Sequence, residues 1–336
     1  RAVATMQTGS FEVGEYGKQL NFTRHYQYEE NGVVKYFGDN FGTATFDATT
    51  RHVTQADRTM HLVKFTRDGK DILMANWRVH PHMTGGGDKT YVSADIIGTT
   101  RYHFEGDMDC HFIYLQGAAG NVNENSKIGA EQHGYTYYKY GRDLANQIYL
   151  AVTNNHLKAT EVGLWQVDHY SYTATSDIAT EEEYNHAKAA KAAFDAWLAE
   201  NPKATSAEKR AKCEQLGYLT WFHFNNVITR HGLDKTYQLP LNTFALGNSL
   251  AFFTAPGELW DTVSMEIEEA SKFPMTLCIG YSQDHFNYFV YDPNNGGEMI
   301  YESYEGNNYR FVAPTTINDM IAYWKQTLNA LYENVE

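Results

Sequence analysis

The residues best able to do chemistry follow apolar stretches of the chain. Residues 72–77 form an apolar run typical of a buried strand, and the imidazole of His80 comes shortly after it. In open α/β sheets, ligands bind at the carboxyl ends of strands, which makes His80 the first candidate for chemistry. A structural histidine packed beneath a loop explains this stretch equally well.

Three further apolar stretches end in turns that carry polar side chains. They are residues 111–115, followed by Gln116 to Asn123; residues 249–254, followed by Glu258; and residues 275–280, followed by Asp284 to Tyr288. If all four ends converge, one site holds an imidazole, a carboxylate and a phenol. Such nitrogen and oxygen donors suit a zinc ion that keeps an open position for water. Spacing alone does not show convergence, because the residues lie up to 208 positions apart (288 − 80).

Two of these groups also have simpler explanations. Small residues between Gln116 and Asn123 let the backbone approach another segment closely, but an ordinary turn accounts for them too. A helix is expected after Glu258, and a carboxylate at a helix start is stabilised by the helix dipole.

The elements that must position these groups predict an α/β fold, with mixed β-sheets flanked by helices. Residues 67–70 have a hairpin-turn composition and lead into the strand at 72–77. Helices are expected at 98–105, with Gly106 ending the helix, and at 138–152 and 316–332. Capping boxes at Thr180 and Thr205 open the two helices of an inserted hairpin over residues 180–232, which carries no chemical motif.

Composition narrows the function classes. The 336 residues, 43% of them hydrophobic, are predicted to form a single domain over residues 1–336. A net charge of −14 without a long Lys/Arg cluster argues against nucleic acid as a partner. No apolar run approaches the roughly 20 residues of a transmembrane helix. The three cysteines are expected to be buried free thiols.

Six short motifs occur in an order that resembles the catalytic domain of the neutral/alkaline, non-lysosomal ceramidases, closest in style to their shorter bacterial members. The motifs are Asn-Trp-x-x-His-Pro at 76–81, Ser-Ala-Asp-x-x-Gly at 93–98, Leu-Gln-Gly-Ala-Ala-Gly-Asn-Val-Asn at 115–123, Pro-Gly-Glu at 256–258, Gly-Tyr-Ser at 280–282 with a later Tyr, and Tyr-Glu at 301–302. No single motif is specific, but their order is hard to obtain by chance. The resemblance covers the chain from about residue 21 onward and is weakest in the hairpin.

The resemblance implies a zinc-dependent amidase that cleaves the N-acyl bond of ceramide. By their positions in the motifs, His80, Glu258 and Tyr288 match zinc-binding residues. Tyr301 matches a second tyrosine near the substrate carbonyl. Asn123, expected to be catalytic together with Tyr288 and Tyr301, stands where ceramidases proper carry a serine, which puts ceramide itself in question more than the hydrolase class.

This resemblance also implies how the reaction works and where it takes place. Bound zinc lowers the pKa of water toward ~7 and polarises the amide carbonyl, while a phenol stabilises the oxyanion. The implied substrate is a small-molecule or lipid amide, and the implied location is extracytoplasmic or secreted.

One departure concerns the metal. The family has a further zinc histidine in an upstream His-x-His-Ser-Gly-Pro motif, which is absent from these 336 residues. Because the sequence begins with Arg1 and looks N-terminally incomplete, a preceding segment or a separate chain is expected to supply that ligand. His82 is a poor substitute because Pro81 separates it from His80. Asp95 and Asn121 are expected to play supporting roles around the site.

Two other functions stay open at this stage. A non-catalytic binding protein could keep the fold with an incomplete metal site. A hydrolase of esters or of sugar-linked amides would have the same sequence features.

Overall fold

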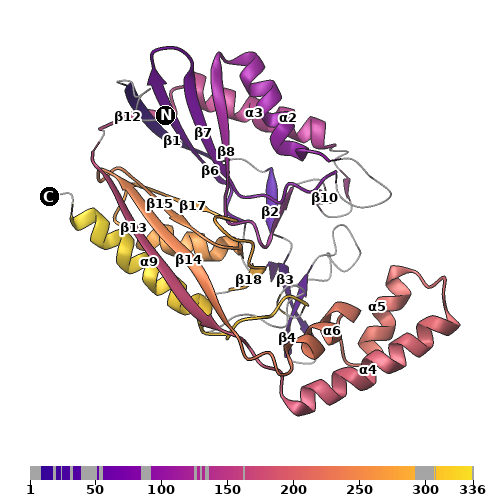
Figure 1. The fold of residues 1–336 in the computed structure, drawn as a ribbon. Coiled ribbons are helices and arrows are strands. Elements are labelled where there is room, and N and C mark those ends of the chain that lie inside the picture. Colours follow the sequence, from indigo (N-terminus) through magenta and orange to yellow (C-terminus); the bar gives the residue numbers. More distant parts are fainter. Residues whose placement is uncertain are drawn as a thin grey trace.

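A computed structural model describes most of the chain, namely residues 9–17, 20–23, 25–30, 33–38, 51–52, 56–84, 92–124, 127–128, 131–132, 136–161, 163–291, 306 and 308–334. Two β-sheets form its centre, and helices cover the outer face of each (Figure 1).

The first sheet has five strands in the order β12-β1-β6-β7-β8. Its strands are β1 (Gly9–Gly17), β6 (Thr59–Arg67), β7 (Asp71–Trp77), β8 (Cys110–Gln116) and β12 (Lys158–Thr160). Neighbours are antiparallel except β7 and β8, which are parallel. The predicted hairpin turn joins β6 to β7, with Gly69 in the left-handed conformation at φ 89°.

The second sheet has four strands in the order β13-β14-β15-β17, of which only β15 and β17 are parallel. Its strands are β13 (Trp165–Thr175), β14 (Thr236–Leu246), β15 (Leu250–Thr254) and β17 (Met275–Ile279). The smaller sheets pair β2 (Asn21–Thr23) with β9 (Val122–Glu124), β16 (Glu258–Leu259) with β18 (Tyr288–Phe289), β10 (Lys127–Ile128) with β11 (Glu131–Gln132), and β3 (His25–Glu30) with both β4 (Val33–Gly38) and β5 (Arg51–His52).

The two large sheets face each other, which gives a four-layer arrangement of helices, sheet, sheet and helices. Helices α2 (Asp95–Asp107) and α3 (Tyr137–Thr153) pack on the first sheet, and α7 (Asp261–Ala270) and α9 (Thr316–Glu333) pack on the second (Figure 1). Apolar side chains of both sheets fill the space between them, among them Phe11, Val63, Phe252 and Leu277. The predicted α/β fold with mixed sheets flanked by helices is confirmed.

Burial on both faces explains the uninterrupted apolar runs in the sequence. In β15, Ala251 and Phe253 pack toward the helices, whereas Leu250 and Phe252 pack toward the first sheet. A strand with one wet face would alternate apolar and polar residues instead.

The helices show two differences from the sequence prediction. Helix α2 begins at Asp95 rather than at residue 98 and continues through Gly106, so Gly106 does not end it. Residues 180–232 form three helices rather than a hairpin of two: α4 (Glu181–Glu200), α5 (Ser206–Gln215) and α6 (Trp221–Arg230). Gly217, at φ 83°, ends α5, and the Thr220 hydroxyl caps α6 by accepting from the His223 backbone N–H.

Further sequence predictions concern the cysteines, membrane spans and the number of domains. All three cysteines are free and buried. Among the described residues, no helix has both the length and the apolar character needed to span a bilayer. The assignment of residues 1–336 to one domain stays a prediction.

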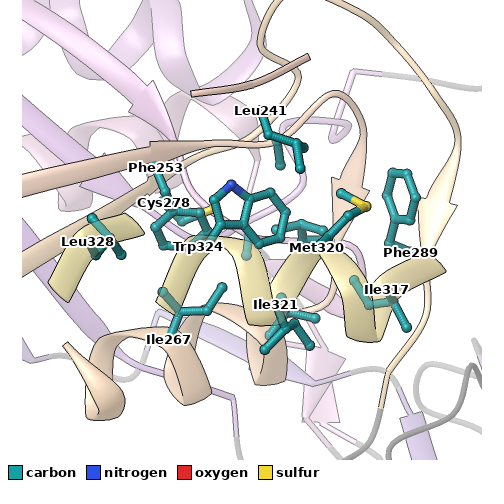
Figure 2. Packing of buried hydrophobic residues seen from close by; sticks show 14 of the residues in the cluster. Leu241, Phe253, Ile267, Cys278, Phe289, Ile317, Met320, Ile321, Trp324 and Leu328 are labelled. Atoms are coloured by element: carbon teal, nitrogen blue, oxygen red, sulfur yellow. The ribbon is translucent and has the colours of Figure 1, made fainter. Parts of the chain in front are cut away.

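Trp324 of α9 lies at the centre of the helix-covered core of the second sheet (Figure 2). Its ring is 5.2 Å from that of Phe253, and its side chain is fully buried. Trp324→Ala is therefore expected to lower the free energy of unfolding by about 3–5 kcal/mol, measured by denaturant titration.

Trp165→Ala is the matched control, because Trp165 is 61% exposed on β13. Its cost is expected to stay below about 1 kcal/mol. Equal costs for the two tryptophans would contradict the described core.

Candidate functional site

The carboxyl ends of the two parallel strand pairs meet at one place. The Gly280 N–H, directly after β17, donates to the Gln116 carbonyl at the end of β8 (2.9 Å). The Asn76 side-chain amide of β7 donates to the Cys278 carbonyl of β17 (2.8 Å). Both sheets therefore deliver their polar turns to the same region, as the sequence required for a common site.

His80 lies three residues beyond β7 and is held by the chain at Val122 of β9. The Val122 carbonyl accepts a hydrogen bond from the His80 backbone N–H (3.1 Å) and lies 2.9 Å from His80 Nδ1. Since a carbonyl only accepts, Nδ1 carries the proton in this arrangement. The other ring nitrogen, Nε2, lies 3.0 Å from Glu258 Oε2 and 3.3 Å from the Tyr288 hydroxyl.

Glu258 and Tyr288 reach His80 from neighbouring strands. They are opposite each other in the parallel pair β16–β18, and the Glu258 N–H donates to the Asn287 carbonyl (2.8 Å). Gly257 allows this approach, because a Cβ at that position would lie 2.3 Å from the Phe286 carbonyl oxygen. The dipole explanation of Glu258 is wrong: helix α7 begins three residues later, at Asp261.

The backbone at Glu258 and Leu259 approaches the small residues of the 116–123 segment. The Gly120 N–H donates to the Leu259 carbonyl (2.7 Å), and a Cβ on Gly120 would lie 2.9 Å from that oxygen. The small residues thus serve close backbone contact, one of the two readings that the sequence left open.

The electrostatics at Glu258 favour the carboxylate. Burial alone raises the pKa of this carboxyl group, but hydrogen bonds involving His80, Tyr288 and Tyr281 outweigh it and hold the pKa below its ordinary value. Glu258 is therefore ionised at neutral pH. The hydrogen bond between His80 Nε2 and Glu258 Oε2, 3.0 Å apart, needs a proton on Nε2, and a metal ion bound by both atoms would take the place of that proton.

Sequence reasoning missed two residues that also reach Glu258. Tyr281 contributes a hydrogen bond to its carboxylate, and His285 Nε2 lies 3.8 Å from Oε1. The rings of Tyr281 and His285 stack at 5.6 Å. Their loop is strained, with Tyr281 at φ 54° and Asn287 at φ 29°, and strained backbone clusters at functional sites. The only signal in the sequence was the density of polar and aromatic residues at 281–288.

A third missed residue, Tyr309, lies beside the site, with its ring 5.5 Å from the ring of Tyr288. The His82 ring lies 5.5 Å from that of His80, and its Nδ1 is 3.2 Å from the His80 carbonyl and 3.7 Å from Glu124 Oε2. Tyr301, predicted to lie near the substrate carbonyl, falls outside the described residues.

The remaining predicted residues are Asn123 on β9, Asn121 just before that strand, and Asp95 at the start of α2. Asn123 follows Val122, is 3% exposed, and its Oδ1 has no hydrogen-bond partner among the described residues. Asn121 precedes Val122 and bonds to Asp261. Asp95 instead ties the start of α2 to Thr84, because its carboxylate accepts from the Ile96 and Thr84 N–H groups.

The donor set fits a metal ion of the zinc type. No group of three or more His, Cys, Asp or Glu side chains with metal-site geometry occurs in the described part of the chain. The gathered set contains one imidazole, one carboxylate and one phenol. From His80 Nε2, Glu258 Oε2 lies 3.0 Å away and the Tyr288 hydroxyl 3.3 Å away. Tetrahedral bonds of zinc length place neighbouring donors about 3.3 Å apart, and a catalytic zinc uses three protein ligands.

The comparisons with known proteins bear on the fold. The sequence matches no protein-family model and no curated protein. Among solved structures, the chain is similar to neutral ceramidase from Pseudomonas aeruginosa, with 17% identity and a TM-score of 0.59 over 99% of this chain and 54% of that one. It is also similar to a ceramidase complexed with C2, with 14% identity and a TM-score of 0.59 over 100% of this chain and 56% of that one.

These likenesses confirm the neutral ceramidase fold that the motifs predicted. The chain spans about half the length of both ceramidase chains. The zinc-ligand roles of His80, Glu258 and Tyr288, the catalytic roles of Asn123 and Tyr301, and the further histidine stay predictions.

The lowered pKa of Glu258 predicts an acid-sensitive site in the metal-free protein. A carboxyl whose pKa is lower in the folded than in the unfolded state stabilises the fold above the unfolded value, 4.5. That contribution is lost as the pH falls from 4.5 through the lower folded value. Glu258→Gln, which does not titrate, is expected to lose less stability than the wild type between about pH 5.5 and about pH 3.5 in chelator.

Thermal unfolding across this pH range measures the difference. Glu208→Gln is a positive control: the pKa of this exposed capping carboxyl is also lowered, by hydrogen bonds from Thr205, so its removal is expected to change the profile in the same direction. A Glu258→Gln profile that runs parallel to the wild-type profile would contradict the ionised, hydrogen-bonded carboxylate.

Proposed function

We propose that this chain carries the metal-holding site of a zinc-dependent hydrolase that cleaves an N-acyl amide bond, with a ceramide-like lipid amide as the candidate substrate. One observation supports the proposal above all others. Side chains from three separate segments, His80, Glu258 and Tyr288, bring their donor atoms together on a neutral ceramidase fold.

His80 and Glu258 would hold the ion. The Nδ1 proton of His80 is directed to the Val122 carbonyl, which leaves the Nε2 lone pair for the metal. Glu258 supplies the negative charge, and its lowered pKa keeps that charge at neutral pH. When bound, zinc supplies Lewis acidity: it polarises a carbonyl and makes water a better nucleophile.

Tyr288 and Asn123 have the chemistry to orient an amide substrate. The Tyr288 hydroxyl lies 3.3 Å from His80 Nε2 and can donate a hydrogen bond to an oxygen that gains negative charge during attack on the carbonyl. Asn123 Oδ1 is a buried acceptor without a partner among the described residues, and a substrate N–H would satisfy it. An ester lacks that N–H, so the proposal favours amides.

A lipid amide is the proposed substrate class because a ceramidase complexed with C2 is a structural neighbour. Aromatic rings of Tyr288 and Tyr309 beside the metal-holding groups provide apolar surface next to the reacting bond.

The test is hydrolysis of a panel of N-acyl amides, including ceramides of short and long acyl chain, together with matched esters. We expect hydrolysis only when zinc is present. A chelator is expected to abolish it, and added zinc to restore it. His80→Ala is expected to lower kcat/KM by at least about a hundredfold, because even loss of a group that merely supports a ligand costs about 10–100-fold.

His111→Ala is the matched control, since it removes an exposed imidazole of β8 outside the site. Its kcat/KM is expected to equal that of the wild type. The proposal fails if zinc-loaded protein hydrolyses no member of the panel. Tight binding of a panel lipid without turnover and without zinc would favour the non-catalytic binding protein instead.

A further inference from the structure

A second polar cluster lies next to the segments that carry His80 and Glu258, and its two central residues are buried. Asn121 is 1% exposed, and Asp261 is fully buried. Asn121 belongs to the segment that leads into β9, and Asp261 is the first residue of α7, three positions after Glu258. Asp261 also has the usual explanation of an acidic residue at a helix start, but that role requires neither complete burial nor a partner.

Asn121 and Asp261 are joined by two reciprocal hydrogen bonds. The Asn121 Nδ2 donates to Asp261 Oδ1 (2.6 Å), and the Asp261 backbone N–H donates to Asn121 Oδ1 (2.8 Å). The other carboxylate oxygen, Oδ2, accepts from the Asp57 backbone N–H (2.9 Å). The pair thus uses every strong acceptor of both side chains, which is how buried polar groups act as fixed joints.

This pair is connected to His80 from two directions. On one side, Asn121 precedes Val122, whose carbonyl holds both the backbone N–H and Nδ1 of His80. On the other side, the Asp57 carboxylate pairs with the buried guanidinium of Arg78 (2.5 Å), two residues before His80. The contacts therefore close a ring that begins and ends at His80.

The same pair is connected to Glu258. Asp261 follows it by three residues, and the intervening Leu259 carbonyl accepts from the Gly120 N–H, next to Asn121. The Asn121–Asp261 pair is consequently a cross-link between the chain segment that supports His80 and the segment that carries Glu258.

We propose that Asn121 and Asp261 are positioning residues that set the separation of His80 Nε2 and Glu258 Oε2, and through it the affinity of the site for a divalent cation. This inference rests on the proposed function for the identity of the ligand. The positioning itself concerns the 3.0 Å separation in the protein alone.

An exchange of the two side chains tests the pair without changing composition or charge. In Asp261→Asn alone, residue 261 has one side-chain oxygen for two donors, Asn121 Nδ2 and the Asp57 N–H. One of the three hydrogen bonds is therefore lost. In the double variant Asn121→Asp/Asp261→Asn, the new carboxylate accepts from the backbone and side-chain N–H groups of residue 261. The new amide oxygen accepts from the Asp57 N–H, so all three hydrogen bonds can re-form.

The first readout is zinc affinity, measured by competition with a chromophoric chelator on the full chain. Each single variant, Asn121→Ala and Asp261→Asn, is expected to bind zinc about 10–100-fold more weakly than the wild type. The exchanged double variant is expected to recover to within about threefold. Asn226→Ala is the matched control, because Asn226 is a 6% exposed amide that accepts from Arg230 Nε (3.1 Å) and donates to the Arg310 carbonyl (3.0 Å) in the α4–α6 insertion.

The inference is overturned if the single variants bind zinc as tightly as Asn226→Ala, or if the exchanged variant folds but does not recover affinity. If Asn121→Ala does not fold, Asp261→Asn carries the measurement, because it keeps the size of the side chain.

The second readout separates this inference from the proposed function. If the wild type binds no zinc, the proposed function fails, and crystal structures of the same variants still decide the positioning. A His80–Glu258 separation that changes by more than about 0.5 Å in Asp261→Asn and returns in the exchanged variant supports it. An unchanged separation in the single variants overturns it.

Discussion

The contact between His80 and Glu258 depends on the way two β-sheets meet. These residues are 178 positions apart, and they lie within 3.0 Å because the carboxyl ends of the parallel pairs β7–β8 and β15–β17 abut. Backbone and amide hydrogen bonds fix this junction, including those from Gly280 to Gln116 and from Asn76 to Cys278. A one-residue shift in the register of β7 or β17 would turn the side chains of that strand to the opposite face of its sheet and displace the turn that follows it.

Packing in the four-layer core offsets the backbone strain in the turns at this junction. The turns around the site contain left-handed backbone at Tyr281 and Asn287, and glycines at 120 and 257 where no side chain fits. Strain of this kind costs of order 1–3 kcal/mol for each residue. Packing between the sheets and under α2, α3, α7 and α9 holds the surrounding chain in place and offsets that cost.

Among the strands that lead to the site, those buried on both faces were the easiest to predict from the sequence. Runs such as residues 72–77 and 275–280 are apolar except for Asn76 and Thr276, so β7 and β17 could be located within a residue or two. The start of α2 was missed because Asp95, at φ 51°, turns the chain by a side-chain hydrogen bond rather than by a glycine. The break between α5 and α6 was missed because helical composition continues across Gly217.

The site could be predicted only in part. The order of the motifs predicted which residues belong to the site. That these residues lie close together depends on contacts between the two sheets, which no local sequence pattern encodes. Tyr281 and His285 reach Glu258 through a loop whose positive φ angles occur at residues other than glycine, so composition gave no sign of its shape. The pairing of Asn121 with Asp261, 140 positions apart, was equally invisible.

Anomalous X-ray scattering at the zinc edge, on crystals of this chain grown with zinc, tests the central claim most directly. The account predicts one strong peak bounded by His80 Nε2, the Glu258 carboxylate and the Tyr288 hydroxyl, and no peak there in His80→Ala. Crystals without a peak at this place, in which the three side chains bond only to other protein groups, would contradict it.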